Sequence, residues 1–365
     1  MAKKKVIILG CGGFVGSHLT DRLLASGRYE IEGWDVSFDK ISQHLGDDNL
    51  TFHQQYVDAK TTFSELEPVI EQCDAVFSLA AVCTPAQYIS SPVKTIQSNF
   101  IDAYRLIDLC SKYRKWLIHT STCEVYGRTL SSYVPDENYT NPDLYEQRED
   151  ETPLVMGPTI NNRWSYATAK QLFERYMLAH GQENGLPFTI VRPYNWFGAR
   201  MDFIPGRDGE GLPRVLACFM TALLDQQPLQ LVDGGGAYRT ITYIDDAVEA
   251  LMLMLEKPEG STNQIFNVGN RGGEVTMKEL AHMMREVAAE ITGRQEFREH
   301  PIEDISAEKF YGTGYEDCDR RVPDIRKAEA RLGWKAKTSL RETLRITMKY
   351  YFENYGREAG FIPKA

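Results

Sequence analysis

The chain has 365 residues, of which 42% are hydrophobic and 25% are charged, and its formal net charge is −10 at pH 7. This composition is typical of a folded globular protein, and the length allows one large domain with a smaller appended lobe. Nucleic-acid binding and membrane-surface binding both need a basic face, so neither is expected of so acidic a chain. An anionic ligand would require a local cluster of arginine or lysine side chains.

The seven cysteines are irregularly spaced and include no Cys-x-x-Cys pair, which indicates free thiols in a reducing compartment. The first residues run directly into an apolar strand, without the pattern of a secretory leader. No apolar stretch approaches the roughly 18 residues that span a bilayer. We therefore expect a cytoplasmic protein, and we expect no metal site.

Apolar runs alternate with helical patterns through the first half of the chain. Strands are predicted at residues 6–9, 30–36, 75–80, 116–120 and 188–192, with helices at residues 15–24, 96–113 and 163–183. This alternation predicts a parallel sheet covered by helices on both faces. The expected fold class is α/β, a Rossmann-type doubly wound parallel sheet.

Beyond residue 193 the pattern becomes less regular, with glycine-rich turns and helices near residues 214–224, 244–256 and 276–292. Residues 1–193 are expected to form an NAD-binding domain, with contributions from about residues 235–260. Residues 194–350 are expected to form mainly a smaller α/β lobe that binds the substrate. The polar residues 131–162 are expected to form an irregular insertion near the site.

A glycine-rich turn lies where the first strand meets the first helix. The spacing of Gly10, Gly13 and Gly16 lets the backbone approach a pyrophosphate at a helix N-terminus. Asp35 ends the second strand, where a carboxylate accepts from a ribose 2′-hydroxyl and repels a 2′-phosphate, so NAD is favoured over NADP. Further cofactor-binding candidates are Phe14, Val15, Ala80 and Asp58, and for the last of these a plain loop acid is an equally good interpretation.

Tyr166 and Lys170 lie one helical turn apart on the same face of a predicted helix. A phenol can accept a proton from a substrate hydroxyl if its pKa falls from about 10 toward neutrality. A neighbouring ammonium and a positively charged nicotinamide both favour the phenolate, so both residues are candidate catalytic and cofactor-binding residues. Thr122, at the end of an upstream strand, would share the proton or bind the reacting hydroxyl.

Several segments resemble the UDP-glucuronate decarboxylating branch of the extended short-chain dehydrogenases/reductases. The segments that carry this resemblance are residues 79–81, 119–127, 163–171 and 192–198. Within that branch, the group of plant-type UDP-apiose/UDP-xylose synthases is similar at residues 83–88, 98–103, 201–206 and 213–219. The likeness covers roughly residues 5–350.

The resemblance implies a reaction sequence. NAD oxidises C4 of UDP-glucuronate with Tyr166 as the base, and the resulting ketone lies β to the carboxylate, so CO₂ is lost readily once the enolate charge is stabilised. Direct reduction of the 4-ketopentose gives UDP-xylose. Opening between C2 and C3, reclosure and reduction gives UDP-apiose.

The resemblance also assigns roles to site residues. Glu124 resembles the catalytic acid of decarboxylation, with a structural strand-end acid as the alternative. Arg321 resembles the arginine that engages the sugar carboxylate, and the alternative is that Arg320 and Arg321 are only a pair of surface residues. Arg163 is expected to reach the sugar as well. Cys83 and Cys123 depart from ordinary decarboxylases of the branch and are expected to pass protons during ring opening and closure, although a free cysteine is often only a small buried hydrophobe.

Asn195, Arg214 and Arg239 resemble positions that contact the diphosphate and the uridine of a UDP-sugar. The helices predicted at residues 96–113 and 163–183 match those through which family members form a homodimer by a four-helix bundle. We expect a homodimer on this resemblance.

Three alternatives remain at this stage. The enzyme could be a decarboxylase that stops at UDP-xylose or at the 4-ketopentose. It could be a nucleotide-sugar 4-epimerase or 4,6-dehydratase, which the combination of Glu124 and Arg321 disfavours. Or it could be a non-catalytic NAD-bound regulator, which an intact set of Thr122, Tyr166 and Lys170 disfavours.

Overall fold

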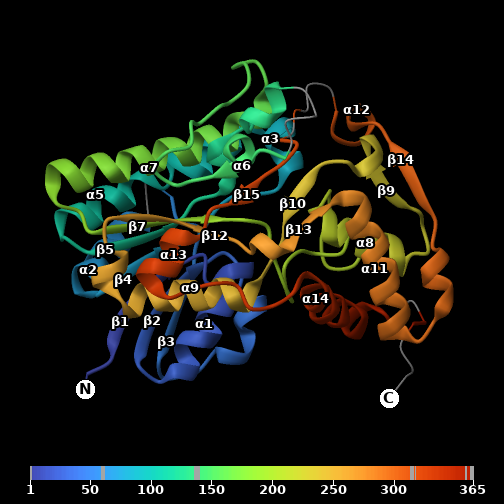
Figure 1. Ribbon diagram of the computed structural model, residues 1–365. Helices are drawn as coiled ribbons and strands as arrows, with labels where there is room; N and C mark the ends of the chain where they lie inside the picture. Colours follow the sequence, from blue (N-terminus) through green and yellow to red (C-terminus); the bar gives the residue numbers. More distant parts are fainter. Residues whose placement is uncertain are drawn as a thin grey trace.

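The computed structural model describes residues 2–58, 62–134, 140–312, 316, 318–357 and 360–361. A seven-stranded sheet forms its centre, and all pairings within it are parallel (Figure 1). Its strands, in spatial order, are β12 (Gln264–Val268), β7 (Phe188–Pro193), β5 (Trp116–Thr120), β4 (Ala75–Ser78), β1 (Lys4–Leu9), β2 (Tyr29–Asp35) and β3 (Leu50–Gln54). The predicted doubly wound α/β fold is confirmed.

Helices cover both faces of the sheet, which explains why its central strands are continuous apolar runs. One face packs against α1 (Phe14–Ser26), α9 (Ile244–Glu256) and α13 (Arg326–Leu332). The other packs against α2 (Thr62–Gln72), α5 (Tyr104–Lys112) and α7 (Ser165–Asn184). In Figure 1, α7 and α5 lie at the upper left of the view, and α9 and α1 lie together in its lower part.

A separate hydrophobic core holds the second lobe together. It is built from α8 (Val215–Leu224), α11 (Met277–Thr292) and α14 (Leu340–Tyr355), beside the parallel pair β9 (Leu229–Val232) and β14 (Ile302–Ile305). Figure 1 shows this lobe beside the sheet, with the antiparallel pair β10 (Tyr238–Thr240) and β13 (Glu274–Thr276) between the two.

Short elements complete the connections. They are α3 (Pro85–Ser90), α4 (Pro92–Ile96), α6 (Pro142–Tyr145), α10 (Pro258–Ser261), α12 (Ala307–Tyr311), the pair β6 (Glu146–Gln147) and β15 (Val322–Pro323), and the pair β8 (Trp196–Phe197) and β11 (Thr242–Tyr243). Within the described ranges, none of the helices combines the length and the apolar character that crossing a bilayer requires.

The helix predicted at residues 96–113 is not continuous. After α4 ends at Ile96, a π-helical turn spans Gln97–Ile101, and α5 begins only at Tyr104. The Asn99 side chain, buried in that turn, donates hydrogen bonds to the backbone oxygens of Val82 and Thr95 at 2.9 Å each. A π-turn adds a residue to the helix and often marks a functional site. Here it ties the helix to the loop that carries Cys83.

The sheet also draws on more of the chain than expected. Its edge strand β12 ends at Val268, beyond the expected contribution of residues 235–260, and α13 comes later still. The expected division into a cofactor domain and a substrate lobe near residue 193 stays a prediction.

Candidate active site

A cavity of about 950 Å³ opens at the carboxyl ends of the central strands and extends into the second lobe. In doubly wound sheets this edge is where ligands bind. The cavity is lined by Thr122, Glu124 and Tyr166 on the sheet side and by residues of β9, β10, α8 and α12 on the other. The sheet and the second lobe therefore share one site.

The glycine turn between β1 and α1 leaves no room for side chains. Gly10 has a φ of +93°, and a Cβ on Gly16 would lie 2.0 Å from the Gly10 carbonyl oxygen. A Cβ on Gly12 would lie 1.9 Å from the Ser37 oxygen. The backbone can therefore approach a ligand closely at the N-terminus of α1, and Phe14 and Val15, which begin that helix, line the cavity.

Asp35 ends β2 next to this turn, as predicted. One of its carboxylate oxygens accepts from the Gly12 N–H at 2.9 Å, and the other accepts from the Ser37 N–H at 3.2 Å. Burial raises the pKa of Asp35. These residues fit the adenosine ribose and pyrophosphate of NAD, because the carboxylate is held at the strand end beside a close-packed glycine turn.

The other two cofactor candidates lie in different surroundings. Ala80 follows β4, and its N–H donates to the Leu9 carbonyl at 2.9 Å, beside Gly10. Asp58 is half-buried beyond the end of β3. Its role beside the adenine stays a prediction.

Tyr166 and Lys170 are both buried at the start of α7, one turn apart. The Thr122 hydroxyl is a hydrogen-bond partner of Tyr166, and the Lys170 ammonium donates to the Thr120 carbonyl at 3.1 Å. Both partners lie where β5 ends, so the helix and the strand end are joined at the reacting groups. This arrangement agrees with the expected grouping of Thr122, Tyr166 and Lys170.

The electrostatics of this trio differ from the simple expectation. Burial raises the pKa of Tyr166 well above its usual value, and burial lowers the pKa of Lys170 to about 8. The lysine alone therefore does not produce a phenolate, because desolvation disfavours both charged forms. Further positive charge near the ring is needed to ionise it.

Tyr88 was not among the predicted site residues. Its ring stacks on that of Tyr166 with centroids 4.6 Å apart and planes 4° apart, and the Arg163 guanidinium lies 5.6 Å from its centre. Stacked rings fix the orientation of the Tyr166 phenol. The only sequence signal was the place of Tyr88 in the segment of residues 83–88.

Glu124 lies between two arginines. Arg163 donates to one carboxylate oxygen at 2.7 Å, and Arg321 donates to the other. Burial by itself raises the pKa of Glu124, but the two guanidinium groups outweigh it and hold the pKa well below its usual range. The structure thus brings together the expected acid and the expected carboxylate-binding arginine, and pairs them with each other.

The two cysteines lie in this cavity in different environments. Cys83 is exposed in the cavity wall, whereas Cys123 is buried with its sulfur 3.8 Å from Arg321 Nη1. Burial raises the pKa of Cys123 to about 11, so it is a neutral thiol near pH 7. Both cysteines line the same cavity as the Tyr166 phenol.

The three residues expected to bind the nucleotide also line the cavity. Asn195, with a φ of +36°, donates to the Thr240 carbonyl at 3.0 Å. Arg214 forms a two-pronged ion pair with Asp202, with its shortest contact at 2.7 Å. Arg239 donates to the Cys318 carbonyl at 2.9 Å.

Fold and site together define a dinucleotide-dependent enzyme with a tyrosine–lysine pair and a carboxylate held by arginines. Residues 6–269 match the model of the NAD dependent epimerase/dehydratase family, and the chain belongs to this family. UDP-D-apiose/UDP-D-xylose synthase from Oryza sativa subsp. japonica is 48% identical, over 97% of this chain and 91% of the relative. UDP-D-apiose/UDP-D-xylose synthase 1 from Arabidopsis thaliana is also 48% identical, over 96% of this chain and 92% of the relative.

A solved structure is similar over the same length. The PbgP3 protein from Burkholderia pseudomallei superposes with a TM-score of 0.82 at 29% identity, covering 99% of this chain and 100% of the other. The sequence relatives and this structure both span essentially the whole chain. The likeness is therefore not confined to the cofactor-binding half.

Proposed function

We propose that this protein is an NAD-dependent enzyme that converts UDP-glucuronate into UDP-apiose and UDP-xylose. The observation that carries the proposal is the carboxylate of Glu124 between Arg163 and Arg321, in one cavity with Tyr166 and two thiols. The two plant relatives that are named for this activity, each 48% identical, support it. Loss of CO₂ from a carbon–carbon bond makes the proposed enzyme a lyase.

The first step needs a proton acceptor at the C4 hydroxyl. Tyr166 accepts that proton, and Thr122, its hydrogen-bond partner, orients the hydroxyl. When bound, NAD supplies the hydride acceptor for this oxidation and the hydride donor for the final reduction. Lys170, together with the positive charge of a bound nicotinamide, would draw the Tyr166 phenol toward ionisation.

The second step is decarboxylation. It needs a group that binds the sugar carboxylate and a proton for the enolate that forms when CO₂ leaves. A substrate carboxylate that enters beside Arg321 and Arg163 competes with Glu124 for the same two cations. The added negative charge raises the pKa of Glu124 from its depressed value, since two neighbouring carboxylates cannot both stay ionised easily. Glu124 can then hold the proton that the enolate takes up.

The third step divides the two products. Ring opening and reclosure move protons between hydroxyl and carbonyl oxygens, and the thiols of Cys123 and Cys83 line the same cavity as Tyr166. The Cys123 thiol keeps its proton near pH 7, so it can donate this proton without first taking one up from another group. We therefore assign the thiols to the branch that leads to UDP-apiose.

Arg214, Arg239 and Asn195 are proposed to bind the UDP moiety at the far end of the cavity. Arg214 and Arg239 supply the local positive charge that an acidic chain needs for a diphosphate. The Asp202 carboxylate holds the Arg214 guanidinium in a fixed orientation beside the cavity.

We also propose that the protein is a homodimer in which residues 96–113, from the end of α4 through α5, and residues 163–183, mainly α7, form a four-helix bundle with the same segments of a second copy. Large apolar side chains are exposed on these segments, among them Ile96 at 40%, Ile101 at 42% and Leu172 at 47%. Burial of such side chains against a second copy would stabilise the dimer. Leu172→Glu should shift the protein to monomer in light scattering, and an unchanged mass would contradict the proposal.

A cytoplasmic location is proposed as well. All seven cysteines are free thiols, a state that a reducing compartment maintains. Microscopy of a fluorescent fusion tests it.

The proposed activity is tested by incubating the purified protein with UDP-glucuronate and NAD and resolving the products by chromatography. UDP-apiose and UDP-xylose should both appear, with one CO₂ for each pentose. UDP-xylose alone would contradict the ring contraction. A UDP-hexuronate epimer without CO₂ would contradict the decarboxylation itself.

A further inference from the structure

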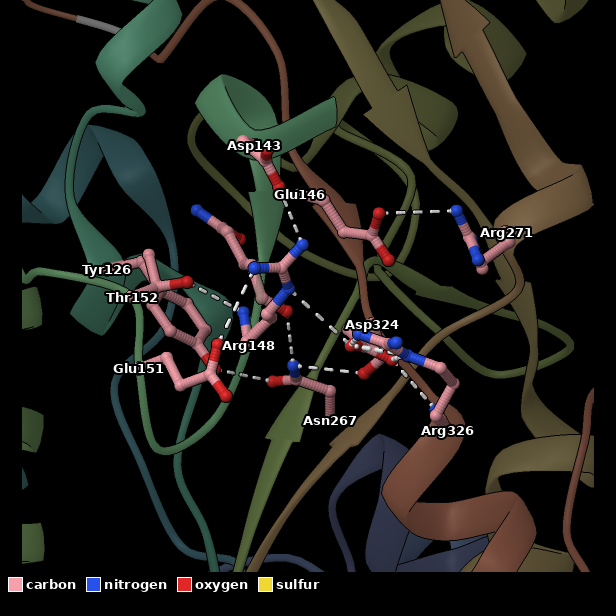
Figure 2. A network of polar contacts seen from close by, with 11 residues as sticks. Tyr126, Asp143, Glu146, Arg148, Glu151, Thr152, Asn267, Arg271, Asp324 and Arg326 are labelled. Carbon is pink, nitrogen blue, oxygen red and sulfur yellow. Dashed lines mark hydrogen bonds and ion pairs between the residues drawn. The ribbon is translucent and has the colours of Figure 1, made fainter. Parts of the chain in front are cut away.

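Asn267 lies in the edge strand β12, and its side chain is completely buried. Figure 2 shows its amide between Tyr126 and Asp324. The Tyr126 hydroxyl donates to Asn267 Oδ1 at 2.9 Å. Asn267 Nδ2 donates to two backbone carbonyls, those of Gln147 at 2.8 Å and Asp324 at 3.2 Å. One amide therefore joins three segments that are far apart in the sequence.

Each of these segments leads directly to the site. Tyr126 ends the 3₁₀ turn Cys123–Tyr126, which contains Glu124 two residues earlier. Asp324 follows β15, three residues after Arg321. Gln147 belongs to β6, which pairs with β15, and its carbonyl also accepts from the Asp324 N–H at 2.9 Å. The Asn267 amide thus connects the backbone segment that carries Glu124 to the backbone segment that carries Arg321.

The surroundings leave these segments little freedom. The Arg192 guanidinium lies 4.6 Å from the centre of the Tyr126 ring and is itself paired with buried Glu174 of α7, at 2.6 Å. The Asn267 backbone N–H donates to Glu149 at 2.8 Å. A buried carbonyl that loses a hydrogen-bond donor destabilises the fold, because no water molecule takes the place of that donor. The amide is therefore one of the buried links that fix the spacing of the two segments, beside the hydrogen bond from the Thr129 hydroxyl to the Arg320 carbonyl at 3.0 Å.

Building on the proposed function, we propose that Asn267 is a positioning residue for decarboxylation, because it sets the geometry of the Glu124–Arg321 pair. It does not line the cavity among the described residues and does not touch the trio of Thr122, Tyr166 and Lys170. Its loss should slow CO₂ release while leaving oxidation at C4 in place. A displacement of about 1 Å in a reacting group costs on the order of 100-fold in rate.

The test compares two rates in single turnover with carboxyl-labelled UDP-glucuronate and NAD, namely formation of NADH and release of labelled CO₂. In Asn267→Asp the oxygen that accepts from Tyr126 remains, but a second oxygen faces the carbonyls of Gln147 and Asp324 and repels them. We expect the ratio of CO₂ release to NADH formation to fall at least about tenfold. The accumulating species is then the 4-keto-hexuronate.

Tyr126→Phe is the second variant, since it removes one hydrogen bond and keeps the ring under Arg192. The same ratio should fall by a smaller factor, and this variant decides the question if Asn267→Asp does not fold. Asn270→Asp is the matched control. The Asn270 side chain also donates to a backbone carbonyl, that of Thr338 at 3.0 Å, but reaches neither segment of the ion pair.

A lowered ratio in the two test variants with a normal ratio in the control supports the positioning role. An unchanged ratio in the test variants overturns it, even if both rates fall together, because that result describes a general loss of structure. If the wild-type protein itself releases no CO₂, the proposed function fails instead, and the two failures are thereby distinguished.

Discussion

The Glu124 carboxylate accepts a hydrogen bond from the Arg321 guanidinium, although the two residues are 197 positions apart in the chain. Both side chains are largely buried, at 17% and 2% exposure, and Arg163 completes the cluster. A buried carboxylate between two guanidinium groups is a stable anion in the free enzyme. In the proposed mechanism it becomes a proton carrier only when a second carboxylate enters, which would couple substrate binding to the acid–base chemistry.

Glu124→Gln should abolish most of the decarboxylation. The amide cannot carry the proton to the enolate, so CO₂ release should fall about 100-fold or more. NADH should still form from UDP-glucuronate, because the trio at β5 and α7 is untouched. Rapid-mixing absorbance together with CO₂ counting measures both steps. Glu342→Gln, which alters an exposed carboxylate paired with Arg345, is the control, and equal CO₂ release by Glu124→Gln and this control would contradict the assignment.

The cysteine pair should control the product ratio. Cys83→Ser and Cys123→Ser replace the thiols by hydroxyls with much weaker acidity, so the fraction of UDP-apiose should fall several-fold while UDP-xylose is still formed. Chromatography of the two pentoses measures the ratio. Cys218→Ser changes a thiol that donates to the Pro213 carbonyl at 3.2 Å and should leave the ratio as in wild type. An unchanged ratio in both site variants would assign the thiols to packing.

Asp35 should determine the choice of cofactor. Asp35→Asn keeps an oxygen for the Gly12 N–H at 2.9 Å but removes the charge that repels a 2′-phosphate. The dissociation constant for NADP should therefore fall about tenfold relative to that for NAD. Fluorescence titration with each dinucleotide measures the ratio, and a ratio equal to that of wild type would contradict a direct role of the carboxylate.

Lys170 should make the stability of the fold depend on pH. Burial lowers its pKa from 10.5 to about 8 in the folded chain. Between these values the unfolded chain binds more protons than the folded chain, so the contribution of this residue to stability rises with pH across that window. Lys170→Met removes the effect. The melting temperature of wild type minus that of the variant should increase from pH 8 toward 10.5, and a constant difference would show that the amine titrates normally.

The sequence predicted the cofactor half of the site best. The glycine turn, Asp35 and the pair Tyr166 and Lys170 follow local rules, because each depends on a strand end or on one helical turn. The strand at Trp116–Thr120 and the helix at Ile244–Glu256 have the predicted bounds for the same reason. Strongly periodic apolar segments need little tertiary information.

Tertiary contacts explain what was missed. The strands β3 and β12 are short edge strands, and β12 joins the sheet only by pairing with β7 from a distant part of the chain. The stacking of Tyr88 on Tyr166 and the contacts of the Asn267 amide follow from no spacing or periodicity in the sequence. The break in the helix at Gln97–Ile101 follows from the buried side chain of Asn99, which a helical pattern alone does not reveal.

In the proposed reaction, one hydride leaves C4 and returns to the product after CO₂ has been lost. Turnover of UDP-glucuronate that carries deuterium at C4, followed by mass spectrometry and NMR of both pentoses, tests it directly. The label should be retained at C4 of the xylose unit and on the hydroxymethyl carbon of the apiose unit. Pentoses without deuterium, or recovery of the label only in an intact hexuronate, would contradict the account.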